Sequence, residues 1–281
     1  MKTGSCVALL YDFDKTLCTK DMQEYTFLPQ LGLDARHFWD ETERYTHEEG
    51  MDPVLAYMYL MLRKMRASGE EFSFRREDIR ELGRAVEFFP GVRDWFGRMR
   101  RYGEREGVHV EHYIISSGLK EIIEGSAIAR EFRAIFASEF HYDRYGAPDW
   151  PLMAVNYTGK TQYLFRINKG VLDISDNDSL NRYQPENERR IPFRNMIYIG
   201  DGMTDVPCMK LVRSYGGTSI AVYTEQSYPH VRELLKQERV NVLVPADYRE
   251  GKTLDKLLFR LIRRMADTDK LLRMEAEQRE L

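Results

Sequence analysis

The sequence predicts an α/β protein in which a mainly parallel sheet is covered by helices on both faces. Six short apolar runs are separated by segments whose apolar residues recur at helical spacing. The runs lack polar alternation, which is typical of strands buried on both faces, and strands that alternate with helices favour parallel pairing. Hydrophobic residues make up 43% of the 281 residues, enough for a packed core. The predicted strands are residues 6–11, 113–115 with the flank before them, 135–137, 196–199, 219–223 and 242–244.

The segment after the first strand has a different composition. Residues 18–87 contain no convincing buried strand, are rich in aromatic residues and methionine, and carry a net charge of −5, whereas the rest carries +2. We expect a helical insertion, with residues 1–17 and 88–281 forming the core domain. The aromatic residues and methionines either face a site on the core or form the insertion's own core, since methionine often fills gaps.

Helix-breaking residues and hydrophobic periodicity predict the later helices and loops. Pro90 and Gly91 interrupt the chain before a predicted helix at 92–102. The polar stretch 173–190 lacks the glycine and distal glutamate of a calcium-binding loop, so we predict a solvated loop. From residue 253 onward leucines recur at helical spacing, which predicts a C-terminal helix packed on the sheet.

Charge and composition exclude several classes of protein. The net charge of −3 argues against a dedicated nucleic-acid binder. The longest apolar run, residues 54–62, is too short to cross a bilayer, and Asp12 interrupts the first apolar stretch before it could serve as a signal peptide. Cys6, Cys18 and Cys208 form no pairable framework. We expect a cytoplasmic protein with no membrane or nucleic-acid partner; its oligomeric state is open.

Acidic residues follow two of the predicted strands directly. Asp12 and Asp14 come after residues 6–11, and Asp201 and Asp205 come after residues 196–199. Ligands of open α/β sheets bind at the carboxyl ends of strands, so these four carboxylates should lie together. Unpaired buried carboxylates are costly, and hard oxygen ligands suit Mg²⁺. The sequence therefore predicts a magnesium site.

A third strand end carries Ser116, Ser117 and Gly118. A hydroxyl beside exposed backbone N–H groups is a usual way to hold a phosphate at a helix N-terminus. These three residues are therefore candidate phosphate-binding residues, with Ser117 as the rival to Ser116.

Together these motifs resemble the haloacid dehalogenase superfamily, specifically its phosphatases. The resemblance covers the sheet-forming parts of the chain and implies a Rossmann-like three-layer α/β/α core with a helical C1 cap inserted after the first strand. It also implies Mg²⁺ as cofactor and a small-molecule phosphate ester as substrate. The motifs, in the family's order, are Asp12-x-Asp14-x-Thr16, a strand ending in Ser116, a later lysine, and Gly200-Asp201-Gly202-x-x-Asp205.

The resemblance assigns a role to each matching residue. Asp12 matches the nucleophile that becomes an aspartyl-phosphate, and Asp14 matches the general acid that later acts as a base. Asp12, the backbone carbonyl of Asp14 and Asp201 match the metal ligands, while Asp205 supports the metal site. Ser116 matches the hydroxyl that binds the phosphoryl group.

The lysine of the third motif has two candidates. Lys160 is preferred, and Lys169 remains the alternative. A lysine is needed because four aspartates sum to −4, whereas Mg²⁺ and one lysine sum to +3. Keeping Asp14 protonated balances the site, as a general acid requires.

The phosphoserine-phosphatase branch is the most similar, since Asp21 occupies the place of a substrate-binding glutamate. Two departures weaken that likeness: Lys15 replaces a serine, and Thr204 replaces an asparagine. No arginine of the insertion is convincingly placed to hold a carboxylate, and an apolar, aromatic cap would suit a hydrophobic or planar leaving group. The sequence leaves open whether Tyr25 and Tyr57 reach the substrate.

The resemblance thus implies a Mg²⁺-dependent phosphatase that hydrolyses a small-molecule phosphomonoester through an aspartyl-phosphate. One alternative is a phosphotransferase or mutase that uses the same intermediate with another acceptor. A second is a non-catalytic module that binds a phosphometabolite, although a binder has no need for both Asp12 and Asp14.

Overall fold

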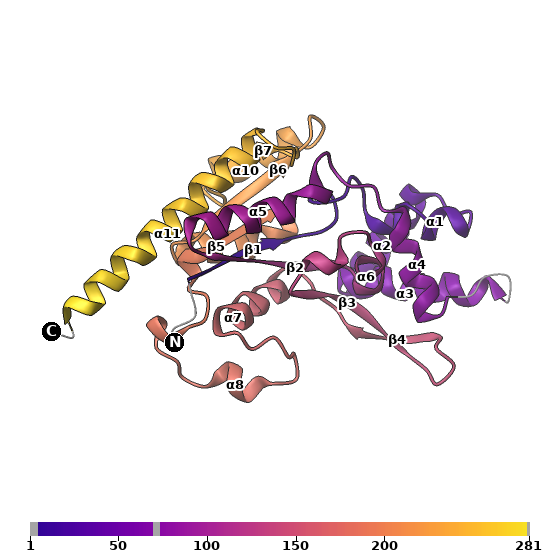
Figure 1. Ribbon diagram of the computed structural model, residues 1–281. Coiled ribbons are helices and arrows are strands. Elements are labelled where there is room, and N and C mark those ends of the chain that lie inside the picture. The colour runs from indigo at the N-terminus through magenta and orange to yellow at the C-terminus, as the bar shows by residue number, and fades with distance from the viewer. Residues whose placement is uncertain (1–4, 70–73, 280–281) are drawn as a thin grey trace.

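The computed structural model describes residues 5–69 and 74–279. Seven strands form one sheet in the order β4-β3-β2-β1-β5-β6-β7, and every neighbouring pair is parallel except β3 with β4 (Figure 1). The predicted mainly parallel α/β fold is therefore confirmed. The strands are β1 Cys6–Tyr11, β2 His109–Leu119, β3 Ala134–Tyr142, β4 Pro148–Met153, β5 Met196–Gly200, β6 Thr218–Tyr223 and β7 Val242–Pro245.

Helices cover both faces of this sheet. In β1, Val7, Leu9 and Tyr11 join one hydrophobic cluster, whereas Ala8 and Leu10 join another, because successive side chains of a strand point to opposite faces. The result is the three-layer arrangement that the sequence predicts. The first cluster is completed by α5 (Val92–Glu106) and α11 (Thr253–Arg279), the second by α7 (Thr161–Lys169), α9 (Val206–Ser214) and α10 (Tyr228–Lys236).

The segment between β1 and α5 is helical where it is described and groups at one end of the sheet, opposite the C-terminus (Figure 1). Asp34 and Asp52 cap its two long helices by accepting backbone N–H groups of the first turn. The two ends of this segment meet, because the Thr19 N–H donates to the Glu87 carbonyl at 3.0 Å. The elements are η1 Met22–Glu24, α1 Phe27–Gln30, α2 Ala35–Glu48, α3 Pro53–Ala67, α4 Arg76–Leu82 and η3 Gly83–Ala85.

The methionines of α3 belong to the core and not to a wall facing the site. Met58 and Met61 are fully buried and Met65 is 6% exposed, all within the larger hydrophobic cluster. Of the two alternatives that the sequence left open, packing in the interior therefore holds for these methionines.

Two regions differ from the sequence prediction. Strand β4 was not predicted; it contains prolines at 148 and 151, which it tolerates because it lies at the edge of the sheet. The loop predicted at 173–190 contains α8 (Asn177–Asn181) and η6 (Glu186–Glu188). It is anchored by Arg166, 2% exposed, whose guanidinium donates to three of its backbone carbonyls.

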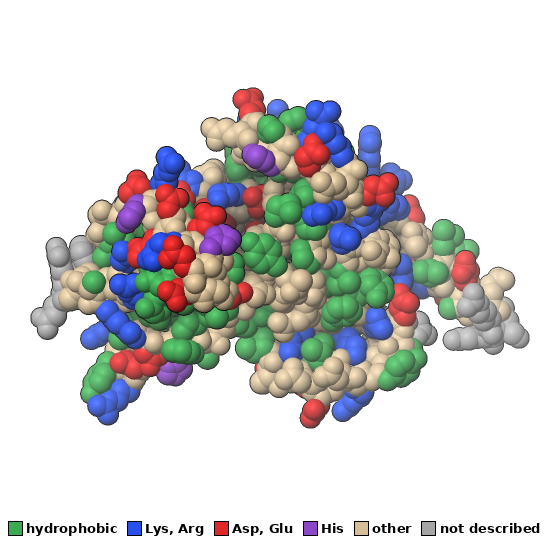
Figure 2. All heavy atoms as spheres, turned by 180° about the vertical axis from the view of Figure 1, so that it is seen from behind, with side chains coloured by type: hydrophobic (Ala, Val, Ile, Leu, Met, Phe, Trp, Pro, Cys, Tyr) green, Lys and Arg blue, Asp and Glu red, His purple; other side chains and the backbone are tan. Residues whose placement is uncertain are grey.

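The remaining elements are short and connect the layers. They are α6 Lys120–Gly125, η4 Ala129–Glu131, η5 Thr158–Lys160, η7 Phe193–Asn195 and η8 Met203–Asp205. Acidic and basic side chains are interspersed over the face that Figure 2 shows. Within the described residues, no helix combines the length and apolar character needed to cross a membrane.

Candidate active site

Strand pairing brings the two acidic motifs together. Tyr11, the last residue of β1, pairs with Ile199 of β5, and the Asp12 N–H donates to the Ile199 carbonyl at 3.0 Å. The chain therefore leaves both strands at the same edge of the sheet. Asp12, Asp201 and Asp205 each offer a carboxylate oxygen, and these oxygens lie within 4.8 Å of one another.

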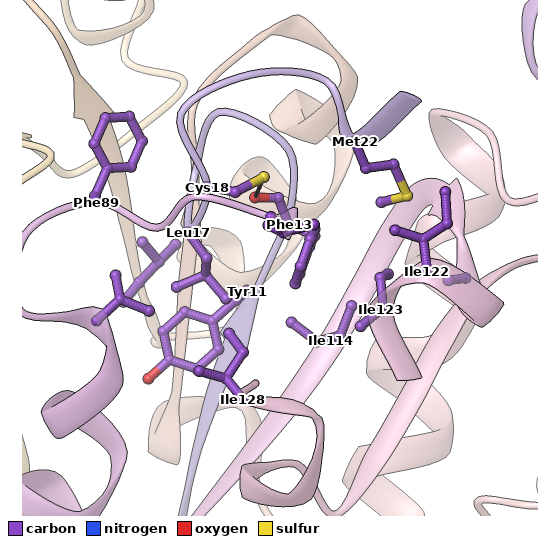
Figure 3. Packing of buried hydrophobic residues seen from close by; sticks show 14 of the residues in the cluster. Tyr11, Phe13, Leu17, Cys18, Met22, Phe89, Ile114, Ile122, Ile123 and Ile128 are labelled. Atoms are coloured by element: carbon purple, nitrogen blue, oxygen red, sulfur yellow. Dashed lines mark hydrogen bonds between the residues drawn. The ribbon is translucent and has the colours of Figure 1, made fainter. Parts of the chain in front are cut away.

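Apolar side chains anchor the loop after β1 to the hydrophobic core. Figure 3 shows Phe13 and Leu17 pointing into the cluster that contains Ile114 and Ile128. The Phe13 carbonyl accepts the backbone N–H groups of residues 16, 17 and 18 and the Cys18 thiol. This compact turn fixes the conformation of the loop that carries Asp12 and Asp14.

Asp14 lies in a tight, mostly buried position. Its Oδ1 accepts the Met22 N–H at 2.9 Å, and a Cβ placed on Gly118 would approach Oδ2 to 2.8 Å, so the glycine makes room for this carboxyl. Burial, reinforced by the charges of Asp21 and Asp12, raises the pKa of Asp14 well above its usual range. A protonated Asp14 is what the charge balance predicts.

Lys160 is fully buried beside the acidic cluster. Its ammonium lies 3.1 Å from Asp12 and 2.8 Å from Asp205. Burial alone would lower the pKa of Lys160, but the charges of the two aspartates outweigh it and raise the pKa. The structure thus brings Lys160 to the site. Lys169 donates to the backbone carbonyls of residues 180 and 182 instead.

Asp205 organises this cluster through its own hydrogen bonds. Its Oδ1 accepts both Lys160 and the Tyr198 hydroxyl, each at 2.8 Å, and its Oδ2 accepts the Asp201 N–H at 3.2 Å. Sequence reasoning missed Tyr198, which was counted only as part of an apolar strand. A signal was present, because a buried tyrosine needs a polar partner for its hydroxyl and Tyr198 precedes Asp201 by only three residues.

The serine motif belongs to the end of β2, not to the turn after it. Strand β2 runs to Leu119, and Ser116 is fully buried with its Oγ accepting the Gly118 N–H at 3.0 Å. The Ser117 carbonyl accepts the Tyr57 hydroxyl at 2.6 Å, whereas the buried Ser117 Oγ has no partner among the described residues. The motif thus lies at the end of β2, and helix α6 begins directly after it at Lys120.

A cavity of about 530 Å³ opens from this motif toward the insertion. On the core side it is lined by Asp14, Ser117 and Gly118, and on the other side by residues of α2 and α3, with Asp21 between them. Asp21 is paired with the Lys15 ammonium at 2.5 Å. Tyr57 lines the cavity, whereas Tyr25 donates to the Glu87 carbonyl and closes the base of the insertion.

The carboxylates fit a hard divalent cation. Burial and the nearby Asp205 raise the pKa of Asp12 to about 6, and burial with the charge of Asp205 raises the pKa of Asp201 well above its usual range. Three carboxylates so close repel one another, and a cation relieves that repulsion. Oxygen donors of this kind suit Mg²⁺.

The comparison with known proteins adds the family. The model of haloacid dehalogenase-like hydrolases matches residues 9–210, which include both acidic motifs, the serine motif and Lys160. The chain belongs to this family. A protein of Borreliella burgdorferi, named only as uncharacterized, is 28% identical to this family member over 274 residues, which are 88% of this chain and 93% of the relative.

Solved structures share the fold of this haloacid dehalogenase-like hydrolase. A substrate-bound phosphoserine phosphatase has 12% identity and a TM-score of 0.56, covering 90% of this chain and 97% of that chain. A family hydrolase from Salmonella enterica serovar Typhi has 18% identity and a TM-score of 0.55, covering 90% and 69%. A probable phosphoserine phosphatase from Vibrio cholerae has 10% identity and a TM-score of 0.57, covering 94% and 67%. Identities this low establish the fold alone.

Proposed function

We propose that this protein is a Mg²⁺-dependent phosphatase that hydrolyses a small-molecule phosphomonoester through an aspartyl-phosphate on Asp12. The observation that carries the proposal is the meeting of Asp12 and Asp14, two residues apart after β1, with Asp201, Asp205 and the buried Lys160 at one edge of the sheet. A binding module gains nothing from two adjacent carboxyls with different protonation, whereas covalent catalysis needs both.

The reaction has two balanced steps. Asp12 Oδ attacks phosphorus, the ester P–O bond breaks, and Asp14 gives its proton to the departing oxygen. Asp14, now ionised, takes a proton from water, whose oxygen attacks phosphorus. The Asp12–phosphorus bond breaks, inorganic phosphate leaves, and both carboxyls return to their first state. The same group acts first as acid and then as base.

The residues around these two have supporting roles. Lys160 holds the Asp12 carboxylate in place and supplies positive charge where the phosphoryl group binds. Asp205 orients Lys160, and Tyr198 orients Asp205. Ser116 and Ser117 provide hydroxyls beside the phosphoryl group, and Gly118 leaves room for the Asp14 carboxyl. Mg²⁺, held by Asp12, the Asp14 carbonyl and Asp201, would supply further positive charge there, with Asp205 supporting its ligands.

We also propose that residues 18–87 form a cap domain on a core of residues 1–17 and 88–281. The chain enters and leaves the segment at neighbouring points, since Cys18 bridges to Phe88 and the Phe89 N–H donates to the Leu17 carbonyl at 3.0 Å. A cap over the carboxylates would exclude water during phosphoryl transfer and open to release product.

Phosphate release from a panel of phosphomonoesters tests the proposal, with and without Mg²⁺. We expect Mg²⁺-dependent release by the wild type, loss of all release in Asp12→Asn, and normal release in the matched control Asp267→Asn on exposed α11. Circular dichroism confirms that both variants are folded. Intact-protein mass spectrometry of quenched Asp14→Asn should show a trapped phosphorylated species on an activated ester. Phosphate release by Asp12→Asn would contradict the role of Asp12 as nucleophile. Consumption of ester with the phosphoryl group found only on an added alcohol would indicate a phosphotransferase.

A further inference from the structure

The wall of the cavity opposite Asp14 is one continuous face of α2. Residues 39, 42, 43, 46 and 47 all line the cavity, and this spacing places them on a single side of a helix. Helix α3 adds the wall beside them. This surface therefore meets whatever group is attached to the phosphate. Its members are Trp39, Thr42, Glu43, Thr46 and His47 of α2 and Pro53, Val54 and Tyr57 of α3.

The hydrogen-bond donors of this wall are already used within the protein. Thr42 and Thr46 each donate to a backbone carbonyl one turn earlier in α2, at 3.0 and 3.1 Å. The Trp39 indole N–H donates to Glu24 at 3.0 Å, and the Tyr57 hydroxyl donates to a carbonyl of β2. A ligand therefore meets ring faces and acceptors on these four residues, since their N–H and O–H groups are occupied.

Acceptors, by contrast, remain open. Gln23 is only 2% exposed and lines the cavity, and its Oε1 has no hydrogen-bond partner among the described residues. An unsatisfied buried acceptor is costly unless a ligand fills it. Glu43 adds a carboxylate at the mouth, 72% exposed, with His47 at 3.6 Å as its neighbour.

The charged side chains that line the cavity are mostly acidic. None of the described residues that line it is lysine or arginine. The Lys15 ammonium is committed to Asp21, and the insertion as a whole carries −5. Such a lining favours a cation over a carboxylate, since the basic side chain on it, His47, lies 3.6 Å from Glu43.

The aromatic rings complete a site for a cation. The rings of Trp39 and Tyr57 lie with centroids 6.2 Å apart and planes at 70°, which forms a corner of two ring faces and edges. Ring faces attract ammonium groups, and tryptophan does so best.

We propose that the substrate is the phosphate ester of an amino alcohol without a carboxylate. Its ammonium group donates to Gln23 Oε1, lies against the Trp39 and Tyr57 rings and is attracted by Glu43, while its phosphate reaches Asp12. This inference rests on the proposed phosphatase function and names the substrate class of the same site. It also separates this protein from one that acts on phosphoserine, whose carboxylate would need a cation in the cavity.

Paired substrates test the charge of the leaving group directly. We would compare kcat/KM for a series of ω-aminoalkyl phosphates with that for their isosteres, in which a methyl group replaces the ammonium group, and with that for phosphoserine. At the best chain length we expect the ammonium ester to exceed its isostere about tenfold or more, and to exceed phosphoserine. Glu43→Gln should reduce this ratio several-fold. Glu48→Gln, a matched change on the exposed side of α2, should leave the ratio unchanged.

A binding measurement keeps this test independent of turnover. Calorimetric titration of the same esters into folded Asp12→Asn protein should show tighter binding of the ammonium ester, and Gln23→Leu in that background should weaken it. Mg²⁺-dependent hydrolysis with equal rates for both members of each pair would overturn the substrate class and leave the phosphatase function intact. Absence of hydrolysis together with selective binding of ammonium esters would overturn the phosphatase function and leave the ligand class intact.

Discussion

Replacement of Lys160 by methionine is the most informative change at the site. The side chain is fully buried, and its ammonium lies 3.1 Å from Asp12 and 2.8 Å from Asp205. Methionine keeps much of the volume and removes the charge, so two buried carboxylates lose their shared partner. Removing one member of a buried ion pair costs about 3–5 kcal/mol. We expect about 3 kcal/mol in free energy of unfolding, because protonation of Asp12, whose pKa is already raised to about 6, relieves part of the repulsion.

Urea denaturation at neutral pH in the presence of a chelator measures this cost without a contribution from metal. The control is Lys169→Met, the other lysine that the sequence offers for the third motif. That ammonium donates only to backbone carbonyls, at 2.5 and 2.7 Å, so its loss should cost about 1 kcal/mol and leave turnover intact. Lys160→Met should instead abolish turnover.

A double-mutant cycle then isolates the interaction. If Lys160 and Asp205 stabilise each other, Lys160→Met combined with Asp205→Asn should cost less than the sum of the single changes, by at least about 1 kcal/mol. Strict additivity, or a loss for Lys160→Met no larger than that of Lys169→Met, would refute the argument that this lysine compensates the buried carboxylates.

Three further predictions concern the glycine beside the acid, a remote ion pair and the metal. Gly118→Ala should lower kcat about tenfold and cost about 1–3 kcal/mol, measured by steady-state kinetics and urea unfolding, because its Cβ would clash with Met22 Cε and meet Asp14 Oδ2 at 2.8 Å and both side chains would have to shift; unchanged kcat would contradict the tight packing. Burial alone would raise the pKa of Glu111, but hydrogen bonds and charge from Arg190 outweigh it and lower the pKa to about 2. This carboxylate therefore contributes about 2 kcal/mol above pH 4.5 that disappears as the pH falls toward 2, and the stability difference between wild type and Glu111→Gln should shrink over that window. Mg²⁺ at about 100 times its Kd should raise wild-type stability by about 2.7 kcal/mol and that of Asp201→Asn much less, as thermal unfolding would show.

The strands that the sequence predicted best are those whose ends are marked by a change in chemistry. The first predicted strand, residues 6–11, matches β1 residue for residue because Asp12 follows it directly. Strand β2 was predicted at 113–115 with an upstream flank of undefined length, because Glu111 and His112 break the apolar run although both are buried, and the strand continues beyond the prediction to Leu119. They are tolerated because Arg190 binds Glu111 and the Tyr11 hydroxyl meets His112. Partners so distant in the chain are invisible to a local pattern.

The same reasoning explains which site residues the sequence revealed. The aspartates were predictable because their position follows from the end of a strand, and a strand end is a local feature. The sequence preferred Lys160 but kept Lys169 as an alternative, because the choice depends on where η5 places one side chain relative to β1 and β5. Tyr198 was missed for a related reason: a single hydroxyl within an apolar strand gains a role only when the fold brings Asp205 within hydrogen-bond distance of it.

The two halves of the proposed site differ in how strongly the fold constrains them. Asp12 and Asp201 are tied to the register of β1 with β5, and a shift of one residue would turn their side chains to the other face of the sheet. The wall formed by α2 has no such constraint, because any side chain that fits can occupy a helix position facing a cavity. Chemistry can therefore stay fixed while Trp39, Glu43 and their neighbours on that face change the group that is recognised. The residues of the motifs therefore do not specify the leaving group, and in our proposal the unpaired Oε1 of Gln23 and the face of α2 do so.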